Sequence, residues 1–210
     1  MTLLAPEQLL AFLSASLLIT LAPGPDNLLV LSIGASQGRR SGIAFGLGCG
    51  LGCLSHTLLA ALGVSALIAA SPLAFNGLRL LGGAYLMLLG WQALRSRGGM
   101  QAPQARAAPA SAWQLFGKGL LANAINPKVV MFFLAFLPQF VASERGPAAW
   151  QLAQLGSVFT LQAAALFAAL GYFAGQVGAW LMRHGNAAVW LDRMAGTVFL
   201  GLGAKLLVGF

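Results

Sequence analysis

Six apolar segments of membrane-spanning length follow one another along this chain, and they constrain its fold more than any other feature. A helix that crosses the hydrocarbon core of a bilayer needs about 20 residues. The segments cover residues 8–35, 43–70, 75–94, 115–140, 150–182 and 189–208. They predict an all-α membrane protein with six transmembrane helices.

The composition excludes two other classes of protein. Only 8% of the 210 residues are charged, against 59% hydrophobic, and the mean hydropathy is +0.82. A soluble domain carries about 25% charged residues, so a soluble protein with a large core does not fit. The net charge of +8 does not indicate nucleic-acid binding, because the basic residues lie mostly between the apolar segments.

The positions of the basic residues predict the orientation. Loops that face the cytoplasm carry an excess of Lys and Arg. The connections after the first, third and fifth segments contain Arg39, Arg40, Arg95, Arg97, Arg106, Arg183 and Arg193, whereas the opposite loops contain Arg145. Both termini are therefore expected outside the cytoplasm. The first 38 residues contain no Lys or Arg, so the charged region of a cleavable signal peptide is absent.

The two halves of the chain resemble each other. Aligning the third segment with the sixth matches a set of leucines and glycines: Leu78, Gly83, Leu89, Gly90 and Leu94 with Leu191, Gly196, Leu202, Gly203 and Leu207. This predicts a 3+3 duplication within a single transmembrane domain, with repeats at 1–94 and 113–210 and a cytoplasmic linker at 95–112. An odd number of helices in each repeat makes the second copy inverted in the membrane.

The first segment contains a proline motif at residues 22–27. Its two prolines remove backbone donors, and the glycine between them loosens the chain. We expect the helix to break here and to restart near Pro25, with free N–H groups that suit a substrate carboxylate. Broken helices in both halves of an inverted repeat indicate the substrate site of a transporter. The predicted binding residues are Pro23, Gly24, Pro25, Asp26 and Asn27. A simple kink is the alternative.

Of the four acidic residues in the sequence, Asp26 is the one that lies well inside a spanning segment. An intramembrane carboxylate is expensive unless it is paired or protonated, and it is usually functional. Asp26 is therefore the predicted proton-coupling residue. It could also cap the restarted helix, and the two roles are compatible.

The fourth segment contains a second proline motif, in which Lys128 follows Pro127 as Asp26 follows Pro25. If the halves are related, the two breaks face each other. We expect an Asp26–Lys128 pair, or two halves of one site for a zwitterion. Lys128 could instead extend toward an interface. The predicted binding residues of this motif are Asn123, Asn126, Pro127 and Lys128.

Other polar groups within the segments give weaker signals. His56 and Gln162 could line a cavity or bond within the fold. Cys49 and Cys53 lie one helical turn apart, which fits small packing residues better than a redox or metal pair. No metal site is expected.

Taken together, the motifs resemble those of the LysE/RhtB-type amino-acid exporters. The resemblance covers essentially the whole chain and is carried by residues 22–27, 126–128, 136–140 and the pattern that begins at Arg79. It implies a bacterial inner-membrane protein that exports amino acids, driven by the proton-motive force. The motifs do not indicate which amino acid is exported.

The sequence therefore predicts a secondary exporter of amino acids or close derivatives, by proton antiport, and not an enzyme. Its partners would be the amino acid, protons and the lipid bilayer. No cofactor or nucleic acid is expected, and the sequence does not decide whether the protein forms a homo-oligomer. The alternatives are a thiol–disulfide electron carrier, which would need exchangeable cysteines in both halves, an efflux protein for another small solute, a membrane hydrolase and a channel. No nucleotide-binding GxxxxGK[ST] motif is present.

Overall fold

The computed structural model describes residues 4–96 and 110–208, and every regular element in these two ranges is helical. The all-helical prediction is thus confirmed. Most of the predicted linker, with Arg97 and Arg106, lies outside the described residues. The α-helices are α1 Pro6–Leu21, α2 Pro25–Gln37, α3 Arg39–Leu59, α4 Ser65–Ala70, α5 Pro72–Arg95, α6 Ala112–Ala124, α7 Pro127–Met131, α8 Ala148–Arg183 and α9 Gly185–Val208. The π-helices are η1 Ala60–Val64 and η2 Phe132–Phe136, and the 3-10 helices are η3 Leu137–Phe140 and η4 Ser143–Arg145.

Between three and five candidate membrane spans can be counted among the described residues. Arg39–Ala70, Pro72–Arg95 and Ala148–Leu181 are each long and apolar enough by themselves. Two further helix pairs qualify only when each is taken as one span, because α1 and α2 are bent by 56° and the pair at residues 112–140 by 50°. The α9 helix is outside this set; it carries Asp192, Arg193 and Lys205.

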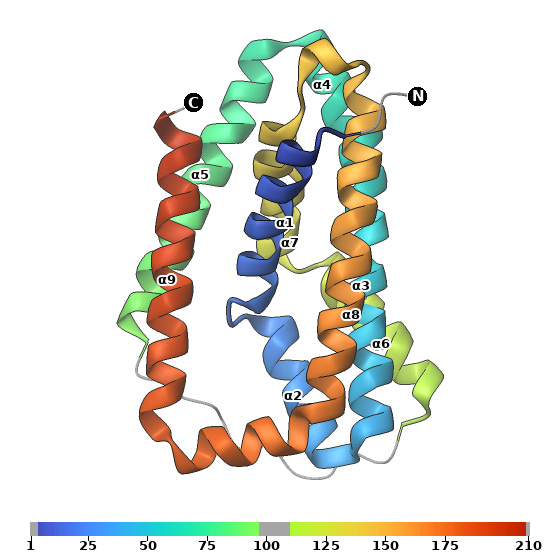
Figure 1. Cartoon of the computed structure of the whole chain (residues 1–210), viewed down its shortest axis with the longest axis vertical. Coiled ribbons are helices and arrows are strands. Elements are labelled where there is room, and N and C mark those ends of the chain that lie inside the picture. Colours follow the sequence, from blue (N-terminus) through green and yellow to red (C-terminus); the bar gives the residue numbers. More distant parts are fainter. Residues whose placement is uncertain (1–3, 97–109, 209–210) are drawn as a thin grey trace.

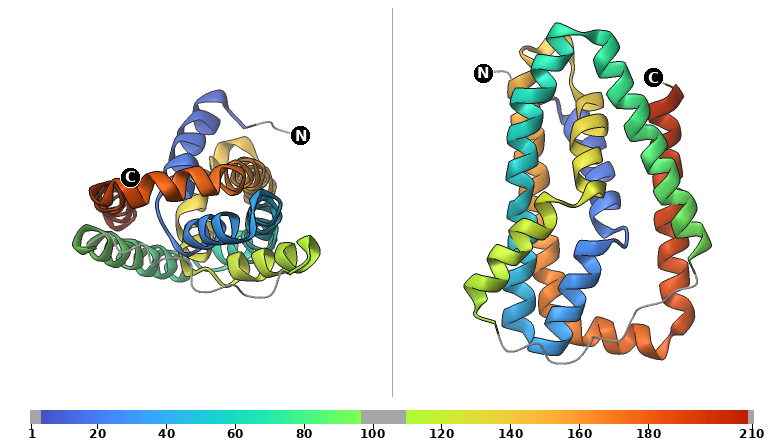
Figure 2. Two further views of the ribbon diagram at one scale, coloured as in Figure 1. Left: turned by 90° about the horizontal axis from the view of Figure 1, so that it is seen from below. Right: turned by 180° about the vertical axis from the view of Figure 1, so that it is seen from behind.

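The helices form two groups that enclose the region of the breaks. Figures 1 and 2 show α3 and α8 side by side, with α6 packed against α3, while α5 and α9 form an antiparallel pair on the other side. The broken segment α1–α2 and the helix α7 run between the two groups, whereas α6 lies on the side of α3 that faces away from α5 and α9. Both termini lie at the upper end of Figure 1, and the α8–α9 junction crosses the lower end.

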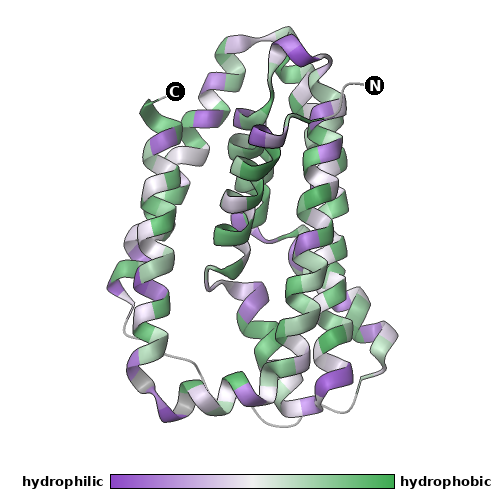
Figure 3. Cartoon of the chain, in the orientation of Figure 1, coloured by the Kyte–Doolittle hydropathy of each residue, from purple (hydrophilic) through white to green (hydrophobic). Residues whose placement is uncertain are grey.

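Hydrophobic side chains cover much of the outer surface. Figure 3 shows apolar residues along most of the length of α3, α5, α8 and α9, with hydrophilic residues gathered toward the ends. Leu58, Leu62 and Leu161 are each more than 60% exposed. Lipid tails would cover such a surface, whereas a soluble monomer rarely exposes large apolar patches.

Glycines let the helix backbones approach closely within each group. A Cβ atom on Gly42 would lie 2.7 Å from the carbonyl oxygen of Gly171, which joins α3 to α8. In the α5–α9 pair, a Cβ on Gly90 would lie 2.8 Å from the oxygen of Gly196, and one on Gly203 would lie 2.9 Å from the oxygen of Gly83. Small residues at helix interfaces are a common packing device in membranes.

Adding one methyl group to the interface between α5 and α9 should lower the stability of the protein. We expect Gly90→Ala to lower the stability of the protein by about 1–3 kcal/mol, because the methyl group would overpack against backbone atoms of α9. Gly201→Ala is the matched control, since a Cβ there meets nothing within 4 Å. The measurement is the thermal transition of the purified protein in detergent, followed by size-exclusion chromatography. Equal transitions for the two variants would contradict the close packing of α5 and α9.

Candidate functional site

The first break leaves backbone carbonyls of α1 without helical partners, and Lys128 binds them. The carbonyl of Ile19 would normally accept from the N–H four residues on, but that residue is Pro23, which has none. The Nζ of Lys128 donates to the oxygens of Ile19, at 3.1 Å, and Ala22, at 2.9 Å. Lys128 is 6% exposed. Its charge is therefore held at the negative end of the α1 dipole.

The start of α2 presents free backbone donors at the same place. Gly24 is the N-cap and provides no side-chain cap, and Pro25 is the first helical residue. The N–H groups of Asp26 and Asn27 belong to the first turn, which has no intrahelical acceptors. The Asn27 side chain turns back across the break and donates to the oxygen of Thr20 at 2.9 Å. A Cβ on Gly24 would come within 2.8 Å of Lys128 Nζ, so glycine allows this approach.

The second break repeats this arrangement with other partners. Asn126 caps α7, and its Oδ1 accepts from the backbone N–H of Lys128 at 3.1 Å. Pro127 leaves the carbonyl of Asn123 without its normal partner four residues on. The Nε2 of His56 donates to that oxygen at 3.1 Å. His56 therefore stabilises the second break from α3 and does not line the large cavity described below.

Asp26 is bound to Asn123 rather than to Lys128. Its Oδ2 accepts from Asn123 Nδ2 at 2.8 Å, and its Oδ1 is buried without a hydrogen-bond partner. Asn123 Oδ1 in turn accepts from the thiol of Cys53 at 3.5 Å. The direct Asp26–Lys128 ion pair that the sequence suggested is not formed, because the carbonyls of α1 hold the ammonium. Both residues nevertheless border one small cavity of about 10 Å³.

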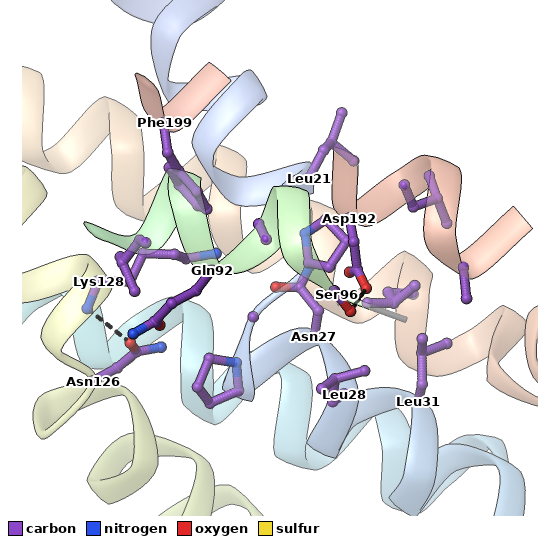
Figure 4. A pocket seen from close by; sticks show the side chains of 18 of the residues that line it. Leu21, Asn27, Leu28, Leu31, Gln92, Ser96, Asn126, Lys128, Asp192 and Phe199 are labelled. Carbon is purple, nitrogen blue, oxygen red and sulfur yellow. Dashed lines mark hydrogen bonds between the residues drawn. The ribbon is translucent and has the colours of Figure 1, made fainter. Parts of the chain in front are cut away.

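A much larger cavity reaches the breaks from the lower end of the molecule. Its volume is about 650 Å³, within the range of small-molecule sites. It extends between α2 and α8 on one side and α5 and α9 on the other (Figure 4). Its polar lining residues include Asn27, Gln92, Ser96, Asn126, Lys128 and Asp192, and most of the others are apolar.

Several buried polar atoms around the breaks have no partner in the structure. They are Asp26 Oδ1, Asn27 Oδ1, Asn126 Nδ2 and Gln162 Oε1. Buried polar groups in native proteins are nearly always hydrogen-bonded, so such atoms call for an explanation. Asn27 and Asn126 line the large cavity, but these atoms themselves are buried behind its surface. The Nε2 of Gln162 is used within the fold, where it donates to Thr20 Oγ1 at 2.8 Å.

Phenylalanines fill the molecule on the other side of the breaks. This aromatic cluster consists of Phe12, Phe132, Phe133, Phe136, Phe140 and Phe159, with ring centroids 5.0–6.3 Å apart in its contacting pairs. Beyond it, Gln151 Nε2 donates to the oxygen of Ala142 at 2.8 Å, and Gln8 donates to Gln151 Oε1 at 3.0 Å. The cavity and the aromatic cluster thus lie on opposite sides of the breaks.

The structure brings together most of the residues that the sequence singled out. Pro23, Gly24, Pro25, Asn27, Asn126, Pro127 and Lys128 line the large cavity, while Asp26, Asn123 and Lys128 line the small one. Sequence reasoning missed Tyr85, Gln92, Ser96, Asp192 and Phe199 on the cavity wall. Asp192 lies near the start of the predicted segment 189–208, where no sequence pattern marks it as a site residue.

The fold and the site define a membrane protein of the carrier type, with a solute-sized cavity that ends at two broken helices. The chain belongs to the LysE-type translocator family, whose model matches residues 17–209. It is 30% identical to the homoserine/homoserine lactone efflux protein of Salmonella typhimurium, over 93% of this chain and 94% of that one. It is 31% identical to the leucine efflux protein of Klebsiella pneumoniae, over 94% and 93%. An uncharacterized membrane protein of Pseudomonas aeruginosa is 32% identical, over 90% and 89%. No solved structure matches the chain.

The Asn123–Asp26 hydrogen bond should be important for stability. Asn123→Ala would leave a second oxygen of the buried Asp26 carboxylate without a partner, and we expect it to cost about 1–3 kcal/mol or more. Asn76→Ala is the matched control, because Asn76 is exposed on α5. Thermal transitions in detergent compare the two variants. A loss of stability in Asn76→Ala as large as that in Asn123→Ala would argue against a special role for the bond.

Proposed function

We propose that this protein exports amino acids from the cytoplasm by proton antiport. The observation that carries the proposal is the position of Lys128, a buried cation at the inner end of a solute-sized cavity and beside the free N-terminus of α2. A cation and unpaired backbone donors suit a carboxylate. Two relatives are named for the efflux of homoserine and leucine, which are both amino acids.

The carboxylate of the substrate would bind between the two breaks. An ammonium group has three donors, and Lys128 uses two of them on the carbonyls of Ile19 and Ala22. The third donor and the N–H groups at the start of α2 would together bind the anion. In this arrangement Pro23, Gly24, Pro25 and Asn27 form one wall of the site, and Asn126, Pro127 and Lys128 form the other.

Asp26 would couple transport to protons. Asp26 is 1% exposed and lines the small cavity that Lys128 also lines. The buried oxygen Oδ1 has no partner, so it can take up a proton without breaking the hydrogen bond from Asn123. Protonation would remove the only negative charge at the breaks and thereby change how strongly Lys128 attracts an anion. Asn123 acts as a positioning residue in this scheme.

Six transmembrane helices in a 3+3 inverted repeat are the topology that we propose. The close contacts of α5 with α9 are themselves symmetric: Gly83 meets Gly203 and Gly90 meets Gly196. The sequence alignment pairs Gly83 with Gly196 and Gly90 with Gly203, so exchanging the two halves converts one contact into the other. The repeats would be 1–94 and 113–210, joined by a cytoplasmic linker at 95–112, and both termini would lie outside the cytoplasm of a bacterial inner membrane.

In this orientation the cavity faces the cytoplasm and the aromatic cluster closes the outer side. An exporter must load its substrate from the cytoplasm, and in this orientation the structure would represent that loading state. Movement of the α5–α9 pair against the remaining helices would then close the cavity to the cytoplasm and open the binding site to the outer side. Broken helices around a fixed central site are a recurring design in secondary transporters.

Transport into inverted membrane vesicles tests the function. We expect vesicles that contain the protein to accumulate at least one labelled amino acid from a panel when their interior is made acidic, since export becomes uptake in this orientation. A protonophore should abolish the accumulation. Control vesicles lack the protein. Accumulation that does not respond to the pH gradient would rule out antiport, and failure to transport any of the panel would rule out amino-acid export.

Two charge-removing variants should separate binding from coupling. Asp26→Asn should lose gradient-driven accumulation but retain exchange of labelled for unlabelled substrate, because the site remains while the proton carrier is lost. Lys128→Gln should raise KM about tenfold or more, as expected for a lost charged hydrogen bond.

The matched controls for these variants are Glu144→Gln and Lys118→Gln, which remove the same charges from exposed positions. Both controls should transport as the unmodified protein does. Full gradient-driven transport in Asp26→Asn would overturn its coupling role, and an unchanged KM in Lys128→Gln would overturn carboxylate binding.

A further inference from the structure

A second charged side chain faces the large cavity, far along the chain from the breaks. Asp192 lies near the start of α9 and is part of the cavity wall, where it is half-buried. Its Oδ2 accepts a hydrogen bond from the hydroxyl of Ser96, directly after α5. The bond links the two helices of the α5–α9 pair at their lower ends. In Figure 4, Asp192 and Ser96 lie to the right of the cavity, and Lys128 and Asn126 lie to the left.

Asp192 is the acid that a solute in this cavity would meet. Asp26 lines the small cavity instead, and one of its oxygens already binds Asn123. Within the described part of the chain, Asp192 has a hydroxyl partner but no cationic one. A carboxylate on a largely apolar wall gains most from a bound cation, because interactions between charges strengthen where water is excluded.

Asn27 lines the same cavity, but its Oδ1 is buried and not open to a solute there. The acceptors at this side of the cavity are therefore the oxygens of Asp192. A carboxylate has two acceptor oxygens for the three donors of a primary ammonium group. The cavity therefore offers donors for an anion at one side and acceptors for an ammonium at the other.

The remaining wall determines which side chain would fit. Leucines dominate it, together with other apolar groups: Leu21, Leu28, Leu31, Leu89, Leu170, Val177, Leu181, Leu191 and Phe199. An apolar wall favours an apolar side chain by about 25 cal/mol for each Å² removed from water. A basic or acidic side chain would have to leave its charge unpaired against these leucines.

We propose that Asp192, held by Ser96, recognises the ammonium group of the substrate, and that the cavity selects zwitterionic amino acids with large apolar side chains. The inference rests on the proposed function and deepens it. It adds a specificity-determining residue on α9, outside both proline motifs. The carboxylate and the ammonium of an α-amino acid are bonded to the same carbon atom, so with its carboxylate at Lys128 the substrate would meet Asp192 when the α5–α9 pair closes on the cavity.

Ligand pairs that differ only in the amino group test this role. The probes are L-leucine and 4-methylpentanoate, which is leucine without its amino group, and their binding to the purified protein in nanodiscs is measured by calorimetry. We expect the unmodified protein to prefer leucine about tenfold or more, the effect of a charge-assisted hydrogen bond. Asp192→Asn should weaken leucine binding by that factor and leave 4-methylpentanoate within twofold.

Two further variants distinguish recognition from a structural role. In Asp192→Asn the amide oxygen can still accept from Ser96, so the link between α5 and α9 is kept while the charge is lost. Ser96→Ala loses that link and keeps the charge. Recognition predicts that Ser96→Ala retains most of the preference for leucine. Glu144→Gln, which removes an exposed charge elsewhere, should bind both probes as the unmodified protein does.

The outcomes separate this inference from the proposed function. A preference for leucine that survives in Asp192→Asn, or an equal loss of both probes, overturns ammonium recognition while vesicle export still stands. Export of charged amino acids in preference to leucine overturns the apolar selection alone. If the vesicles transport no amino acid and neither probe binds, the proposed function fails together with this inference.

Discussion

The hydrogen bonds from Lys128 to the end of α1 fix the two broken segments against each other. Burying an ammonium group in a membrane protein is expensive unless it is paired or fully hydrogen-bonded. Here two carbonyl oxygens at 2.9 and 3.1 Å and the face of Phe199, whose ring centroid lies 5.8 Å from Nζ, provide the compensation. Because those carbonyls are free only while α1 is interrupted, the break and the position of the lysine depend on each other.

The same logic explains how a membrane helix can tolerate the prolines. In hydrocarbon, every freed backbone group needs a partner within the protein. Pro23 frees the carbonyl of Ile19, which Lys128 binds. Pro127 removes the usual partner of the Asn123 carbonyl, which accepts instead from the N–H of Asn126 and from His56. Each break is thus stabilised by a side chain from another element. Residues 22–27 and 123–128 therefore form a single connected structure rather than two separate kinks.

The sequence predicts where the helices end and restart in this region, because these positions depend on which residues lack a backbone N–H. Proline has no N–H, so helix ends at Leu21 and Ala124 and helix starts at Pro25 and Pro127 follow from residue type. Side-chain direction is a different matter. A direct Asp26–Lys128 pair was one of two arrangements expected if the breaks face each other, the other being two halves of one site for a zwitterion. In the structure the carbonyls of α1 bind the ammonium of Lys128 instead.

The cavity wall could not be predicted for a related reason. Asp192 and Ser96 are separated by 96 residues, and each lies near the end of its own segment, where a polar residue is normally explained by contact with water or headgroups. Their meeting depends on how α5 and α9 pack, which is set by glycines that resemble ordinary membrane-helix composition. No local pattern distinguishes such a pair from two unrelated surface residues.

The α5–α9 pair connects this packing to function. The two helices approach each other closely at Gly83, Gly90, Gly196 and Gly203, so they pack as one unit. It meets the other helices closely where Gly82 packs on Ala135 of η2, above the breaks, whereas below them the cavity separates the two groups (Figures 1 and 4). In the proposed transport cycle, this pair would close the cavity by turning about the end at which it is held. A solute that bridges Lys128 and Asp192 would favour the closed arrangement, because only then could both of its charged groups be bound.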